Sequence, residues 1–339
     1  MLLFRLFATL LCLAAFSMAA PAGTDAPTHN GDACRYETLQ VPALSLAGNK
    51  TGEATRQPVY VYLPPSYAES GTQRYPVLYF FAGYYESSDI AYLARGVEAT
   101  LRQHEFIVVS INDVNSLHGT FGANSPVTGH WRDFFLTEAI PYIDAHYRTL
   151  ATADGRAVGG FSMGGHVALR LAFEHPEIFA TLYAVSPGVF DEHGLENAMK
   201  TWDQTFLNAY GAAYSPNLQK PFPHADYPSM DGSPEDLAIR AKWKKGFGEL
   251  PQLIDAYLAQ PVRLKAIALE VGMKDEYPWI PDGCVYLNDL LRTQGLAHTF
   301  VLTDNHHEFD AAVFEAGMGA FVARKFAKLA KPAAAAKAP

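Results

Sequence analysis

The pentapeptide Gly-Phe-Ser-Met-Gly at residues 160–164 constrains the fold of this 339-residue chain more than any other segment. It matches the pattern G-x-S-x-G, which places a serine on a sharp turn between a strand and a helix. Glycine suits the flanking positions because a side chain there would collide with the neighbouring strand or block the hydroxyl. Residues 156–159 before it are short and largely apolar, and residues 165–173 after it have helical periodicity. The segment therefore predicts a strand, a tight turn at Ser162 and a helix.

Apolar runs alternate with helical patterns along most of the chain. Two β-rich segments come first, at 36–46 and 57–63. Continuously apolar runs, typical of parallel strands covered by helices on both faces, follow at 77–82, 106–111, 156–161, 181–186, 264–271 and 298–302. Helical patterns lie between the runs, at 88–102, 131–147, 163–173, 282–293 and 309–329. The alternation predicts an α/β fold whose mostly parallel sheet has about eight strands, the first of them antiparallel.

Residues 190–260 interrupt this alternation, because the segment is too long for a single crossover. Its middle, 221–228, holds prolines that exclude a regular element. Two interpretations are open: an insertion that shapes or covers a pocket, or a helical excursion whose aromatic residues belong to the core. The aromatic residues are Trp202, Phe206, Tyr210, Phe222, Tyr227, Trp243 and Phe247.

The two ends of the chain differ from the middle. Residues 1–21 resemble a secretion signal, with Arg5 in a short positive start, an apolar run at 6–16 and small residues after it. We expect cleavage near residues 19–22 and export to the periplasm or the cell exterior; an uncleaved anchor is the alternative. The domain would then span 22–329, and the Ala/Lys/Pro-rich segment 330–339 would be a disordered tail. No later run is long and apolar enough to span a bilayer.

Composition and cysteine count narrow the class further. Apolar residues make up 49% and charged residues 18% of the chain, as in globular proteins. Loss of Arg5 with the signal takes the formal net charge from −9 to −10, which disfavours nucleic acid and anionic membrane surfaces as partners. Cys12 leaves with the signal, so Cys34 and Cys284 remain. In an exported protein these two predict one disulfide, and two free buried thiols are the alternative.

A serine on such a turn becomes a nucleophile when a histidine takes its proton and a carboxylate orients the histidine. In this arrangement the residues follow in the order serine, acid, histidine, each after a strand. Asp275 follows the run at 264–271 and is the favoured acid, with Glu276 as the alternative. His306 and His307 follow the last run, and only one can face the serine because adjacent side chains point in different directions. A metal role for this pair is disfavoured, since no spaced His or Cys cluster accompanies it.

Stabilising a tetrahedral intermediate requires N–H donors for its oxyanion. One donor normally comes from the residue after the nucleophile, here Met163, and the other from the loop after an earlier strand. The run at 77–82 leads to Gly83, where the backbone can approach closely, so the N–H of Tyr84 is the expected second donor. The alternative is that Gly83 merely turns the chain.

Further segments accompany the serine motif in a fixed order. They are Tyr75-Pro76-Val77-Leu78-Tyr79, Trp131-Arg132-Asp133-Phe134, Ile140-Pro141-Tyr142-Ile143-Asp144 with Tyr147-Arg148, Gly165 after the motif, Ala168-Leu169, and His175-Pro176 with Phe179. By these segments the chain resembles, over residues 57–326, the esterase D-like family of the α/β-hydrolase superfamily. That family includes S-formylglutathione hydrolases, feruloyl esterases, enterochelin-type esterases and mycolyltransferases. The resemblance implies an α/β-hydrolase fold.

The resemblance also bears on the site. The family often closes with a Gly-His-Asp-like segment, which aligns with residues 306–308 and favours His307 as the catalytic histidine. The chain departs from the family at Ala82, where many members have histidine, and at His306, where glycine is usual.

Weaker candidates surround these residues. The family uses the region 112–133 near its pocket, so His118, His130 and Trp131 are candidates to line the substrate site, with packing or capping as the alternative. His166, one helical turn after the motif, is expected to be structural.

Together these features imply an exported serine esterase that hydrolyses small-molecule or saccharide esters through an acyl-enzyme, without a cofactor or metal. The alternatives are an acyltransferase that uses the same acyl-enzyme and a noncatalytic binding protein on the same fold. Export disfavours S-formylglutathione as the substrate. The sequence predicts neither the ester nor the oligomeric state.

Overall fold

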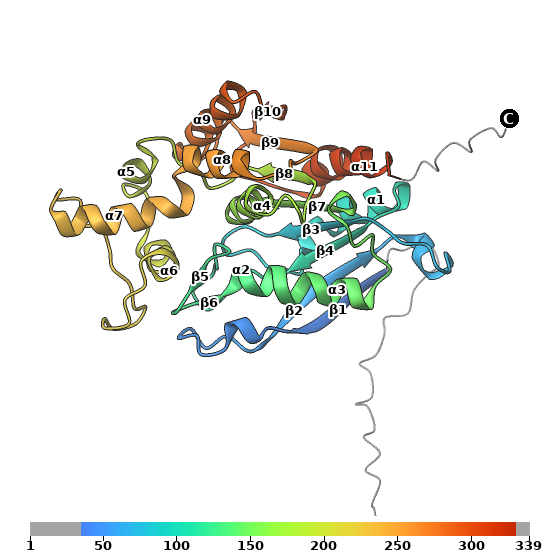
Figure 1. The fold of residues 1–339 in the computed structure, drawn as a ribbon, viewed down its shortest axis with the longest axis horizontal. Coiled ribbons are helices and arrows are strands. Elements are labelled where there is room, and N and C mark those ends of the chain that lie inside the picture. Colours follow the sequence, from blue (N-terminus) through green and yellow to red (C-terminus); the bar gives the residue numbers. More distant parts are fainter. Residues whose placement is uncertain (1–34, 330–339) are drawn as a thin grey trace, which may run out of the picture.

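The computed structural model describes residues 35–329; the predicted signal at 1–21, Cys34 and the tail at 330–339 lie outside this range. Its centre is a sheet with the strand order β1-β2-β4-β3-β7-β8-β9-β10 (Figure 1). β2 pairs antiparallel with β1 and β4, and the other neighbours are parallel. The strands are β1 Arg35–Pro42, β2 Arg56–Leu63, β3 Val77–Phe81, β4 Ile107–Ile111, β7 Arg156–Phe161, β8 Thr181–Val185, β9 Ala266–Gly272 and β10 Thr299–Thr303. This is the predicted α/β-hydrolase sheet, with its antiparallel strands first.

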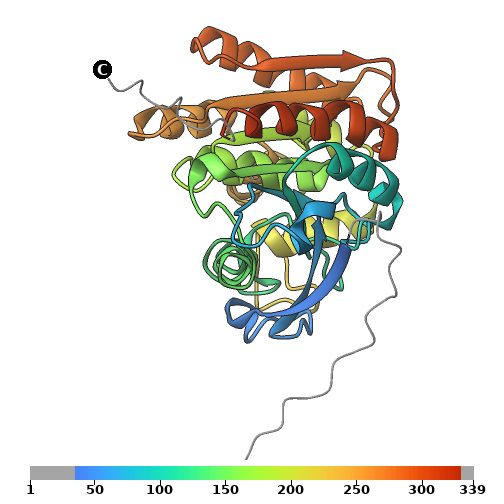
Figure 2. The same ribbon diagram turned by 90° about the vertical axis from the view of Figure 1, so that its right-hand side faces the viewer.

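Helices cover both faces of this sheet, which explains why its inner strands are largely apolar (Figure 2). Every residue of β3, β4 and β8 is buried. One face is covered by α1 Ala94–Gln103 and by a C-terminal helix formed by α10 Ala311–Val313, a π-helical stretch Phe314–Gly319 and α11 Ala320–Phe326. The other face is covered by α2 Trp131–Asp133, the π-helical stretch Phe134–Ala139, α3 Ile140–His146, α4 Met163–Glu174, α8 Leu250–Ala259 and α9 Trp279–Thr293. Each face has its own cluster of buried apolar side chains.

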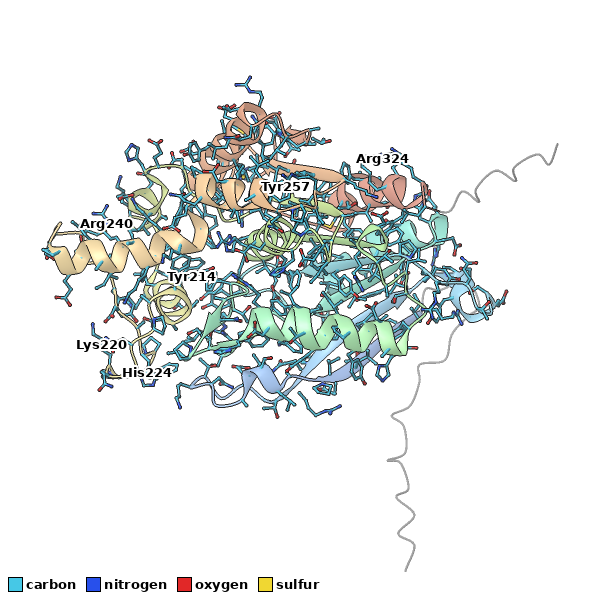
Figure 3. All side chains as sticks on the ribbon, viewed as in Figure 1. Tyr214, Lys220, His224, Arg240, Tyr257 and Arg324 are labelled. Atoms are coloured by element: carbon cyan, nitrogen blue, oxygen red, sulfur yellow. The ribbon has the colours of Figure 1, made fainter. Side chains whose placement is uncertain are left out.

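The segment between β8 and α8 adds a separate group of helices at one end of the sheet, on the left in Figure 1. It contains α5 Gly194–Ala198, α6 Gln204–Tyr214 and α7 Pro234–Phe247. Tyr210 and Trp243 are completely buried here, and the Tyr210 hydroxyl donates to the Trp243 carbonyl oxygen at 2.9 Å. Figure 3 shows Arg240 and Lys220 at the outer edge of this group and Tyr214 on its inner side, toward the sheet.

The segment at 190–260 has features of both interpretations, and its role stays a prediction. Tyr210 and Trp243 form a core, as an ordinary helical excursion would, while Trp202, Phe206 and Phe247 line a cavity. The last portion of the segment, α8, is not part of the added group, because it packs on α4 as a regular covering helix.

The structure also has features that the sequence did not predict. β5 Asn124–Ser125 and β6 Gly129–His130 form a small antiparallel hairpin before α2. Within residues 35–329, no helix combines the length and the apolar character needed to cross a membrane.

Candidate active site

Ser162 alone forms the turn between β7, which ends at Phe161, and α4, which begins at Met163. Its φ of 55° and ψ of −116° are strained for a residue with a side chain. Cβ atoms added at Gly160 and Gly164 would collide with backbone atoms of Gly164 and Phe81, respectively. The predicted strand, sharp turn and helix are thus present, for the predicted steric reason.

A continuous series of short contacts leads from the Ser162 hydroxyl to a buried carboxylate. Ser162 Oγ lies 2.9 Å from His307 Nε2, and His307 Nδ1 lies 2.6 Å from Asp275 Oδ2. The Asp275 side chain is fully buried, and its Oδ1 accepts the N–H of Tyr277 at 2.9 Å. The His307 ring packs between Phe161 and Tyr277, with ring-centroid distances of 4.8 and 5.1 Å. The structure brings the predicted serine, acid and histidine together in the order that lets a base take the hydroxyl proton.

His306 lies outside this series. Its side chain is 60% exposed, and its Nδ1 lies 2.6 Å from Glu276 Oε1. Glu276 Oε2 accepts the backbone N–H of His307 at 3.0 Å. These hydrogen bonds, that of the His307 N–H first, lower the pKa of Glu276 to about 2. Asp275 therefore holds the ring of His307, while Glu276 holds its main chain.

The two predicted oxyanion donors lie beside the same cavity as Ser162 and His307. Tyr84 follows the end of β3, and Met163 opens α4. Within residues 35–329, neither N–H donates to a protein acceptor in the hydrogen bonds of the loops and caps. Both are thus available to an oxygen bound in the cavity, and the N-terminus of α4 adds partial positive charge there.

The cavity beside Ser162 has a volume of about 390 Å³. Polar lining comes from Thr201 and Asp203, which are both exposed. The described lining contains no lysine or arginine. Aromatic side chains make up half of the lining residues and come from the loop after β3, the added group between β8 and α8, and the start of α9 with the residues just before it: Tyr84, Tyr85, Trp202, Phe206, Phe247, Tyr277 and Trp279. The cavity suits a flat or apolar group attached to a reacting carbonyl.

Two predicted pocket residues lie elsewhere, so that prediction was wrong. Trp131 is completely buried in the core, where its Nε1 donates to the Thr128 carbonyl oxygen at 2.8 Å. The His130 side chain is exposed, and its Nδ1 lies 3.5 Å from Asp133 Oδ2. Packing, part of the stated alternative, accounts for Trp131, whereas His130 precedes α2 without a side-chain capping hydrogen bond.

The other two histidines of interest support neighbouring parts of the structure. His118 stacks on Tyr85, with ring centroids 4.0 Å apart, and so contacts a wall residue of the cavity. His166 is buried, and its Nε2 lies 3.2 Å from the hydroxyl of Tyr214. Burial lowers the pKa of His166 well below its usual range. The structural role predicted for His166 fits these contacts.

Part of the cavity wall was missed by sequence reasoning, including Tyr85, Tyr277 and Trp279. Trp202 and Phe206 are four residues apart in the aromatic-rich segment, and Tyr277 and Trp279 follow Asp275 within four positions. The position of Tyr277 and Trp279 was a usable signal, because the chain segment that directly follows a catalytic acid starts beside the site.

Cys284 is a free thiol and is completely buried on α9. Its Sγ lies 3.9 Å from the Pro187 carbonyl oxygen, and burial raises its pKa above the usual range. Because Cys34 lies outside the described residues, the disulfide between the two stays a prediction. The alternative, two free buried thiols, is likewise untested.

We predict that Glu276 stays ionised at unusually low pH. Its pKa is lowered from 4.5 to about 2, so its hydrogen bonds contribute stability that is fully present above pH 4.5 and is lost as pH falls toward 2. In a carbon-13 NMR titration of the side-chain carboxyl, the Glu276 signal should keep its ionised position from about pH 6 down to about pH 3. His306→Ala should raise the midpoint only in part, because the His307 N–H remains. A midpoint of 4.5 in the folded protein would contradict the bonding described here.

Comparison with known proteins identifies the family and the fold. Residues 53–310 match the family model Esterase, described as "Putative esterase". Esterase Rv1288 of Mycobacterium tuberculosis (strain ATCC 25618 / H37Rv) is 36% identical over 128 residues, which cover 36% of this chain and 27% of that protein. The chain thus matches about a quarter of the length of that relative.

Solved structures show the same fold. A ferulic acid esterase aligns with a TM-score of 0.60 at 21% identity, covering 86% of this chain and 99% of that one. FphF, a fluorophosphonate-binding serine hydrolase of Staphylococcus aureus, aligns with a TM-score of 0.61 at 17% identity, covering 86% and 98%. At these identities the likeness to the solved structures concerns the fold alone. The match to the family model, in contrast, spans most of the chain. The protein therefore belongs to the esterase family, as the resemblance of its sequence implied.

Proposed function

We propose that this protein is an exported serine esterase that hydrolyses carboxylic esters through an acyl-enzyme. The observation that carries the proposal is the series of contacts from Ser162 Oγ through His307 to the buried carboxylate of Asp275, at the wall of an aromatic cavity. Membership of an esterase family supports ester hydrolysis over other reactions of the same residues. The signal-like segment at 1–21 supports export.

In the first half of the reaction, His307 Nε2 takes the proton of Ser162 as Oγ attacks the ester carbonyl. Asp275 accepts a hydrogen bond from Nδ1–H, which leaves Nε2 free to act as the base. The carbonyl oxygen becomes negative and is held by the N–H groups of Met163 and Tyr84. His307 then gives its proton to the leaving alkoxide, so an alcohol departs and an acyl group stays on Ser162.

The second half repeats these steps with water. His307 takes a proton from water as its oxygen attacks the acyl carbonyl, and the same two N–H groups hold the new oxyanion. When the bond to Ser162 Oγ breaks, His307 returns the proton to Oγ. The products are a carboxylic acid and free enzyme, so no cofactor is consumed.

Substitution of the reacting residues tests this assignment. Ser162→Ala and His307→Ala should each lower kcat/KM for a p-nitrophenyl ester by about 10⁴-fold or more, because either change removes the activated nucleophile. His306→Ala is the matched control: it removes an exposed hydrogen bond to Glu276, so activity should fall by less than about fivefold. The assignment is wrong if Ser162→Ala keeps wild-type activity, and the choice of histidine is wrong if the two histidine variants exchange these effects.

The charge of the cavity predicts a second property. Because Asp203 lines the cavity and lysine and arginine are absent from the described lining, an anionic substrate gains no ion pair and meets a like charge. We expect p-nitrophenyl butyrate to be hydrolysed with a kcat/KM about tenfold or more above that of p-nitrophenyl hemiglutarate, whose acyl chain ends in a carboxylate.

Asp203→Asn should lower the ratio of kcat/KM for the butyrate ester to kcat/KM for the hemiglutarate ester, because the anionic ester no longer meets a like charge. The change removes the charge but keeps the helix cap, since Asn can also accept the Phe206 N–H that Asp203 Oδ1 accepts at 2.8 Å. Equal kcat/KM values for the two esters in the wild-type enzyme would show that this carboxylate does not select substrates.

A further inference from the structure

The turn after β3 is held by one residue, Glu86, through both its main chain and its side chain. The N–H of Glu86 donates to the Gly83 carbonyl oxygen at 3.1 Å, and Glu86 Oε2 accepts the Gly83 N–H at 2.8 Å. Glu86 therefore binds both backbone polar groups of Gly83. Tyr84 and Tyr85 form the corner between the two residues.

The orientation of the Tyr84 N–H follows from these bonds. The carbonyl of Gly83 and the N–H of Tyr84 belong to one planar trans peptide unit, so they point in opposite directions. The Gly83 carbonyl, held by the main-chain N–H of Glu86, thus directs the Tyr84 N–H away from Glu86. The Glu86 carboxyl group fixes the preceding peptide unit, because it accepts the Gly83 N–H. Tyr84 and Ser162 line the same cavity, and the Tyr84 N–H is one of the two proposed oxyanion donors.

The other side of the corner is also held. Tyr85 has a φ of 68°, a value that costs energy for a residue with a side chain. Its N–H donates to the His118 carbonyl oxygen at 3.2 Å, and its ring stacks on that of His118. The peptide units before and after Tyr84 are therefore both fixed, as a preorganised oxyanion site requires.

Glu86 is itself held in place. The Tyr92 hydroxyl donates to Glu86 Oε2 at 2.7 Å. A Cβ atom at Gly83 would lie 2.9 Å from Glu86 Oε2 and 3.2 Å from Cδ1 of Phe161, the residue before the proposed nucleophile. Glycine at position 83 thus has a specific reason: it lets the carboxyl group reach the backbone beside the sharp turn.

We propose that Glu86 is a positioning residue that aims the Tyr84 N–H at the oxyanion. The proposal rests on the proposed function, because it concerns the transition state of the same reaction. A carboxylate near a developing negative charge is unfavourable in itself. The role of Glu86 is therefore to supply a hydrogen-bond acceptor, which a neutral amide oxygen can also supply.

Two substitutions separate the acceptor from the charge. Glu86→Ala removes the acceptor and should lower kcat by about 10- to 100-fold with KM within about twofold, because the oxyanion contact forms only in the transition state. Glu86→Gln keeps an acceptor for the Gly83 N–H and should retain kcat within about threefold of wild type. If Glu86→Ala fails to fold, Glu86→Met replaces it. Methionine has a similar length and no acceptor oxygen, so the same loss of kcat is expected.

Glu138→Ala is the matched control. Glu138 Oε1 likewise accepts a backbone N–H, that of Ser45 at 2.9 Å, together with the Ser45 hydroxyl at 2.9 Å, and neither residue lines the cavity. This variant should lower the melting temperature and leave kcat unchanged. The measurement is steady-state hydrolysis of a p-nitrophenyl ester with a thermal melt of each variant.

The proposal is overturned if Glu86→Ala keeps wild-type kcat, if it raises KM alone, or if Glu86→Gln loses as much kcat as Glu86→Ala. Failure of the proposed function gives a different pattern, since Ser162→Ala would then hydrolyse the ester as fast as wild type. If Ser162→Ala loses activity but Glu86→Ala keeps full activity, the positioning role of Glu86 is rejected while the proposed function stands.

Discussion

The first turn of α4 lies against the backbone at the end of β3, and this contact determines the geometry of the site. Gly164 permits the contact, because a Cβ atom there would collide with the carbonyl oxygens of Phe81 and Ala82. Since the loop that carries Tyr84 leaves the same end of β3, the contact brings the N–H groups of Tyr84 and Met163 to one cavity beside Ser162. The strained backbone of Ser162 follows from the same close approach, so the glycines, the turn and the proposed oxyanion site depend on one another.

Acidic side chains then hold the loops around this turn. The carboxyl groups of Asp275 and Glu276 hold the ring and the main chain of His307, and that of Glu86 holds the N–H of Gly83. Each of these carboxyl groups accepts a backbone N–H of a loop that bears a reacting group or lies beside one. Backbone bonds of this kind suit a site on loops, because loops lack the hydrogen-bond ladders that keep helices and strands in place.

Much of the fold was predictable because continuously apolar strands and amphipathic helices have strong periodic signals, as at 156–161 and 163–173. The residues of the site were predictable as far as chain order determines them: serine, acid and histidine each follow a strand. Spacing alone could not separate His306 from His307, because that choice depends on which ring meets Asp275 and which meets Glu276. Side-chain direction was equally hidden at Trp131, a large aromatic residue at the start of α2 that is buried in the core. The cavity wall depends on how α6 and α7 pack on each other at one end of the sheet, and local sequence does not encode that packing.

The central claim is that Ser162 is an activated nucleophile beside two oxyanion donors. The most direct test is to treat the folded protein with a fluorophosphonate and to locate the adduct by peptide mass spectrometry. We expect one adduct, on Ser162, which His307→Ala prevents and His306→Ala does not. A protein that forms no adduct, or that carries it on another serine, would contradict the account.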